Sequence, residues 1–110
     1  MSERILKINK LIKQQLGQII TKELEFPKNC LITITRVETT PDMKIAKVFI
    51  TVIPENLRGS ALELLRKNNK LLSQQLKKRI TFKFAPNLNF LIDEQEAYAT
   101  EIDKLLDEIK

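Results

Sequence analysis

The chain contains no histidine and no tryptophan among its 110 residues, and only one cysteine and two glycines. Without imidazole groups, histidine-based metal sites and histidine acid–base catalysis are excluded. The isolated Gly17 and Gly59 cannot form a glycine-rich phosphate-binding loop. Cys30 has no partner for an internal disulfide and no imidazole to activate it. We therefore expect a structural cysteine in a reducing, cytoplasmic environment.

Long apolar runs are also lacking, and no stretch approaches the roughly 18 residues needed to cross a bilayer. The opening sequence MSERILKINK does not have the continuous apolar region of a signal peptide. A chain of this length is most simply one domain, here residues 1–110, with 94–110 forming an acidic terminal helix. The carboxylates of that segment indicate a solvated surface rather than a catalytic pair. We predict a monomeric protein that is not an enzyme, with no cofactor, no bound metal, no small-molecule substrate and no membrane partner.

Charge is distributed unevenly along the chain. Residues 1–85 carry 17 Lys and Arg against 7 Asp and Glu, whereas residues 86–110 carry 2 against 7. A basic body favours a polyanionic partner, although the same charges also keep a protein in solution.

Hydrophobic periodicity predicts an α+β fold in which helices pack on one face of a small sheet. A helix over 3–24 follows from a stripe of isoleucines and leucines, and Gly17 within it suggests a close approach by another element. Ser60 and Glu63 fit a capping box, which predicts a helix starting near Ala61. The predicted order is helix 3–24, strands 31–38 and 45–53 as an antiparallel pair, two helices within 61–80, a strand at 88–92 and a terminal helix.

The Asn68–Asn69 pair interrupts a leucine seam at the point where another apolar residue would continue one helix. A buried Asn without partners would cost about 1–3 kcal/mol, whereas a corner lets both amides face solvent or cap the next helix. We therefore predict two helices that meet at a corner, not one continuous helix from Ala61 to Arg79. The tolerance of Asn for left-handed backbone makes such a corner feasible without glycine.

Basic residues gather around this corner, with seven positive charges within the 18 residues from 66 to 83. Lys and Arg at this density can neutralise several phosphates, and a helix N-terminus adds backbone donors. A solvated helix face is the alternative interpretation. The predicted RNA-binding residues are Arg66, Lys67, Asn69, Lys70, Lys77, Lys78, Arg79 and Lys83. The phenylalanines alternate as core residues do, so base recognition by aromatic stacking is not expected.

Three stretches resemble the ribosome-binding factor A family: RILKINKLIKQQLGQII (4–20), ITITRVETTPDMKIAKVFITV (32–52) and LLSQQLKKRITFKFAPNLNFLID (71–93). Asp42 matches the acidic residue of the family's polar turn, and Ala46-Lys47-Val48 matches the core of its second strand. A Pro-x-Leu-x-Phe-x-x-Asp signature is matched by Pro86, Leu88, Phe90 and Asp93. The family's Ala-x-Gly kink is replaced here by Asn68-Asn69-Lys70.

The resemblance implies a single type II KH-like domain that binds the 30S ribosomal subunit and its 16S rRNA. It further implies a role in late small-subunit maturation, 5′-end rRNA processing and cold adaptation. Two other functions remain open on the residues alone. One is a protein–protein scaffold that acts through the acidic C-terminal helix, and the other is a general single-stranded RNA-binding module.

Overall fold

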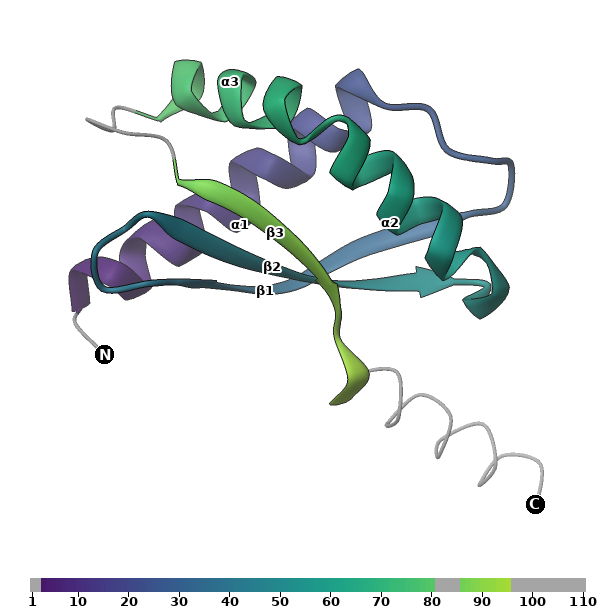
Figure 1. The fold of residues 1–110 in the computed structure, drawn as a ribbon, viewed down its shortest axis with the longest axis horizontal. Coiled ribbons are helices and arrows are strands. Elements are labelled where there is room, and N and C mark those ends of the chain that lie inside the picture. The colour runs from purple at the N-terminus through teal and green to yellow at the C-terminus, as the bar shows by residue number, and fades with distance from the viewer. Residues whose placement is uncertain (1–2, 81–85, 96–110) are drawn as a thin grey trace.

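The computed structural model describes residues 3–80 and 86–95, and it confirms the predicted α+β class (Figure 1). Lys83 and the predicted terminal helix beyond residue 95 lie outside these ranges. The elements are α1 (Glu3–Glu23), β1 (Leu31–Thr39), β2 (Ile45–Ile53), a 3-10 turn η1 (Glu55–Leu57), α2 (Arg58–Lys67), α3 (Asn69–Arg79) and β3 (Asn87–Ile92). Their order is the one predicted from periodicity.

Helix α1 buries the predicted apolar stripe, including Ile12, Leu16 and Ile19. The expectation for Gly17 was wrong, because a Cβ added at this position would meet nothing within 4 Å. Gly17 instead borders a shallow pocket between α1 and β1. No close approach by another described element requires glycine at this point.

The sheet has the strand order β1-β2-β3, with β1 and β2 antiparallel and β2 and β3 parallel. A tight polar turn joins the first pair. In it the Asp42 carboxylate accepts hydrogen bonds from the Thr40 hydroxyl (2.6 Å) and the Lys44 amide (3.0 Å). These bonds, the Thr40 bond foremost, lower the pKa of Asp42 below its ordinary 3.8.

One face of the sheet is buried, and the helices pack against that face. The inward side chains of β2 and β3 join a single core with the stripes of α1, α2 and α3. These inward residues are Ala46, Val48, Ile50, Val52, Leu88 and Phe90. The alternate residues of the same strands point to the opposite face, which no helix among the described residues covers (Figure 1).

Helix α2 begins three residues before the predicted start at Ala61, so the capping-box prediction was wrong. The turn η1 runs directly into the helix, and Arg58 already has helical dihedral angles (φ −54°, ψ −50°). Ser60 consequently lies inside the first turn, and Leu57 occupies the N-cap position without a side-chain hydrogen bond. The preceding turn, rather than a serine hydroxyl, leads the chain into α2.

Candidate nucleic-acid interface

Asn68 separates α2 from α3, which confirms the predicted corner. Its dihedral angles (φ −100°, ψ 14°) interrupt the helix but are not left-handed, so the corner does not use the conformation in which Asn replaces glycine. The Leu64 carbonyl accepts hydrogen bonds from both the backbone amide (3.2 Å) and the side-chain amide (2.8 Å) of Asn68. The Asn68 carbonyl in turn accepts the Leu72 amide (2.9 Å) and begins α3.

Asn69 and Arg66 attach this corner to the free edge of β3. The Asn69 side-chain nitrogen donates to the Leu88 carbonyl (2.8 Å), and the Arg66 guanidinium donates to the Phe90 carbonyl (2.9 Å). Residues two apart on a parallel edge strand point their carbonyls to the same side, and these two point away from β2. The prediction that both Asn side chains face solvent or cap the next helix was therefore wrong. The Asn68 side chain bonds to the Leu64 carbonyl, and the Asn69 side chain bonds to the Leu88 carbonyl.

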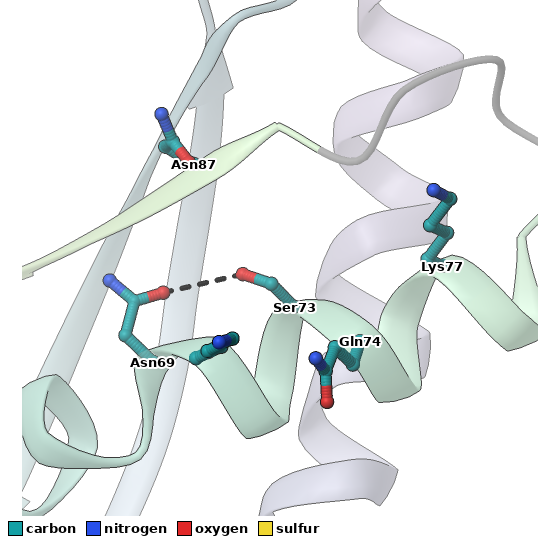
Figure 2. A pocket seen from close by; sticks show the side chains of 6 residues that line it. Asn69, Ser73, Gln74, Lys77 and Asn87 are labelled. Atoms are coloured by element: carbon teal, nitrogen blue, oxygen red, sulfur yellow. Dashed lines mark hydrogen bonds between the residues drawn. The ribbon is translucent and has the colours of Figure 1, made fainter.

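A shallow pocket lies beside the corner, between α3 and the start of β3 (Figure 2). Its lining residues are Asn69, Lys70, Ser73, Gln74, Lys77 and Asn87. Lys70 and Lys77 are separated by two helical turns, about 10 Å along the axis. The described lining contains amides, a hydroxyl and two ammonium groups but no carboxylate, and α3 has no acidic residue in its sequence. This composition suits an anionic ligand with several phosphates.

The structure places seven of the eight predicted RNA-binding residues, and these fall into two groups. The exposed lysines are Lys67, Lys70, Lys77 and Lys78. Arg66, Asn69 and Arg79 make hydrogen bonds within the protein, the last of them to Gln18 of α1 (3.1 Å). Lys83 lies outside the described residues. Only Asn69, Lys70 and Lys77 line the pocket, which also includes Ser73, Gln74 and Asn87. The basic cluster in the sequence gave no sign of these three polar residues.

Asp93, at the end of the recognised signature, has a structural setting of its own. Its carboxylate is buried, accepts the Thr35 hydroxyl (2.5 Å) and lies 3.7 Å from the Arg36 guanidinium. Thr35 lies at the β-bulge between Ile34 and Arg36, and Arg36 also stacks 4.0 Å from the centre of the Phe49 ring. The carboxylate therefore joins the end of β3 to the bulge of β1 across β2.

Residues 3–80 and 86–95 hold no group of three or more His, Cys, Asp or Glu residues placed to bind a metal ion. Across the same ranges, no helix is long and apolar enough to cross a membrane. The pocket between α1 and β1 is also lined by two lysines, Lys10 and Lys13, but of these two pockets it is the one at the corner that contains predicted RNA-binding residues.

Comparison with known proteins decides the family. The family model described as "Ribosome-binding factor A" matches residues 4–106. The chain belongs to the ribosome-binding factor A family. Among relatives of that name, it is 34% identical to the protein of Thermodesulfovibrio yellowstonii, with 98% of this chain and 92% of the relative covered. It is 31% identical to the protein of Chlamydia pneumoniae, with coverages of 99% and 93%.

Solved structures of ribosome-binding factor A share this fold. The crystal structure of the Thermus thermophilus protein is 25% identical, with a TM-score of 0.73 and coverage of 80% of this chain and 93% of that one. A homology model of the Thermus thermophilus factor, fitted into a cryo-EM map of its complex with 30S, is 26% identical. Its TM-score is 0.67, and the coverages are 76% and 88%.

The signatures of ribosome-binding factor A occupy structural positions in this chain. Ala46 and Val48 are buried in β2 while Lys47 is exposed, and Leu88, Phe90 and Asp93 are all buried. These motifs therefore form the sheet and its bulge contact. The pocket at the corner takes Asn87 from within the Pro86–Asp93 signature and Asn69 and Lys70 from the place of the family's kink, and its other lining residues belong to α3.

Proposed function

We propose that this protein is a non-enzymatic assembly factor that binds the free 30S ribosomal subunit through 16S rRNA. The observation that carries the proposal is the pocket at the α2–α3 corner, whose described lining is polar and cationic and lacks carboxylates. Family membership adds support, because a Thermus thermophilus relative has been fitted into a 30S complex. We assign to this binding a role in late small-subunit maturation, in 5′-end processing of 16S rRNA and in growth in the cold. We place the protein in the cytoplasm.

In this proposal the exposed lysines bind rRNA phosphates, with Lys70 and Lys77 in the pocket and Lys67 and Lys78 beside it. Arg66 and Asn69 hold the corner against β3 and position the pocket, and Arg79 holds α3 to α1. Lys83 remains a predicted contact. Phosphate contacts of this kind fix a protein on RNA without reading bases, so a structured subunit is the expected target rather than a short single strand.

The test is sedimentation of the tagged protein with purified 30S subunits over a range of salt concentrations. We expect the double variant Lys70→Glu/Lys77→Glu to lose co-sedimentation and to reduce the salt dependence of binding by about two phosphate contacts. The matched control is Lys7→Glu/Lys22→Glu, which makes the same change in net charge at exposed positions of α1 that line neither pocket. If both variants lose binding equally, diffuse charge attraction rather than the pocket explains the binding. If neither variant loses binding, the proposed site is wrong.

The maturation role needs a separate readout. In cells that depend on this gene, the pocket variant should accumulate 16S precursors with unprocessed 5′ ends and should grow poorly in the cold, whereas the α1 control should not. Normal rRNA processing by a variant that no longer binds 30S would contradict the assigned role while leaving the binding site intact.

A further inference from the structure

The sheet face opposite the helices presents apolar side chains that nothing among the described residues covers. We call it the open sheet face. It is formed by the outward residues of the three strands, namely Leu31, Thr33, Arg36, Glu38, Ile45, Lys47, Phe49, Thr51, Ile53, Asn87, Asn89 and Leu91. Leu31 is 60% exposed, Ile53 53% and Ile45 41%, and Phe49 and Leu91 are half-buried. A face with this many aliphatic groups is typical of an interaction site.

Leu31 and Ile53 are cross-strand partners, as are Phe49 and Leu91, so their side chains lie next to each other on the face. The apolar groups therefore form two cross-strand pairs, and the Thr33–Thr51 pair lies between them. Lys47 is exposed on the same surface beside its cross-strand partner Glu38, and Arg36 is already paired with Glu38 (3.3 Å) and Asp93 (3.7 Å). A matching partner needs apolar side chains flanked by charged groups.

The chain carries such a segment directly after β3. Residues 96–110 place Tyr98, Ile102, Leu105, Leu106 and Ile109 at helical spacing, with five acidic and two basic residues around them. We propose that residues 96–110 dock on the open sheet face, with the apolar stripe against the strands and a carboxylate toward Lys47. This inference concerns a different surface from the rRNA pocket and does not depend on it.

Geometry supports an intramolecular partner. The chain leaves the sheet at Asp93, whose amide still donates to the Ile50 carbonyl (2.8 Å) of the central strand. Fifteen residues in helical form would measure about 22 Å, whereas three strands span about 10 Å. The segment is thus long enough to cross the sheet, and its attachment raises its effective concentration at the face far above that of a separate partner.

Docking there would hold the acidic end on the side of the molecule opposite the helices that carry the rRNA pocket. The carboxylates would then be kept away from Lys70 and Lys77, so the pocket would remain available to phosphate. The arrangement accounts for a chain that combines a basic body with an acidic terminal segment.

Hydrogen exchange on the full-length protein tests the proposal. Amides of residues 98–109 should be protected, and the double variant Leu31→Thr/Ile53→Thr should lower that protection about tenfold, equivalent to about 1.4 kcal/mol. Threonine keeps a good strand propensity at both positions. The matched control is Leu6→Gln on α1, since Leu6 is 52% exposed and does not belong to the sheet.

Tyr98 gives a second readout, because it is the only tyrosine and the chain has no tryptophan. Acrylamide should quench its fluorescence more strongly in the sheet variant than in the wild type or the Leu6→Gln control. Unprotected amides in the wild-type segment would overturn the proposal, as would protection that survives in the sheet variant. Protection that rises with protein concentration together with a dimer mass would assign the face to a second copy instead, and would also overturn it.

Discussion

Replacing Asn69 with Ala tests whether the corner is held by the edge of β3. The substitution removes the 2.8 Å bond to the Leu88 carbonyl and the weaker 3.3 Å bond that the Ser73 hydroxyl donates to Asn69. A partly buried carbonyl that loses its donor costs about 1–3 kcal/mol. Alanine returns up to about 0.7 kcal/mol through its higher helix propensity. We therefore expect a net loss of about 1.5 kcal/mol in the free energy of unfolding.

Urea denaturation measures this loss directly. With a slope between about 1 and 3 kcal/mol per molar urea for a small protein, the midpoint should fall by roughly 0.5–1.5 M. Native-state hydrogen exchange should show the largest increase in opening at β3, because the missing bond joins that strand to the helices.

Asn68→Ala is the matched control at the neighbouring position. Its side chain also bonds to a carbonyl, but Leu64 would keep its bond from the Asn68 backbone amide, so no carbonyl loses every donor. The expected cost is below about 0.5 kcal/mol. If Asn68→Ala destabilises the protein as much as Asn69→Ala, the bond to β3 is not what stabilises the corner.

Three further substitutions examine other parts of the fold. Gly17→Ala should raise the melting temperature by about 4 °C, because the new Cβ meets open space and alanine favours the helix by about 0.5–1 kcal/mol; a lower melting temperature would mean that the position needs glycine. Thr35→Val should cost about 1–2 kcal/mol in urea denaturation by removing the hydroxyl that donates to Asp93, whereas Thr35→Ser should retain most of the stability. Asp42→Asn should be less stable than the wild type at neutral pH. The lowered pKa of Asp42 means that its ionised form stabilises the fold, so this difference should be constant above the ordinary pKa of 3.8 and shrink as pH falls through the lower folded value. A difference that grows in acid would contradict the role of that carboxylate.

Periodicity predicted the elements whose burial repeats along the chain. The stripe of α1 and the alternation of β2 each depend on one apolar face, which a sequence displays directly. The start of α2 was missed because η1 brings the backbone into helical geometry before Ser60 is reached. A local capping pattern carries no information about the turn that precedes it.

At the corner too, local features were predictable from the sequence, whereas contacts with distant parts of the chain were not. A polar residue in a leucine seam predicted a break at Asn68, which is a local inference. The partners of Asn69 and Arg66 are carbonyls about twenty residues away along the chain, so their bonds depend on where β3 lies in space. Charge density likewise identified the basic helices, but only packing distinguishes lysines that line a pocket from an arginine that bonds to a strand.

The two edges of the sheet are protected from aggregation in different ways. Arg66 and Asn69 occupy carbonyls on the free side of β3, so a foreign strand would have to displace two side chains before it could pair there. At β1, a bulge disturbs the pairing pattern, and Lys10 and Lys13 border the pocket beside Ile32 and Ile34. An incoming strand at β1 would meet positive charge and an irregular register. The side chains that hold the corner pocket against β3 therefore also help to keep a β-rich surface from recruiting other chains.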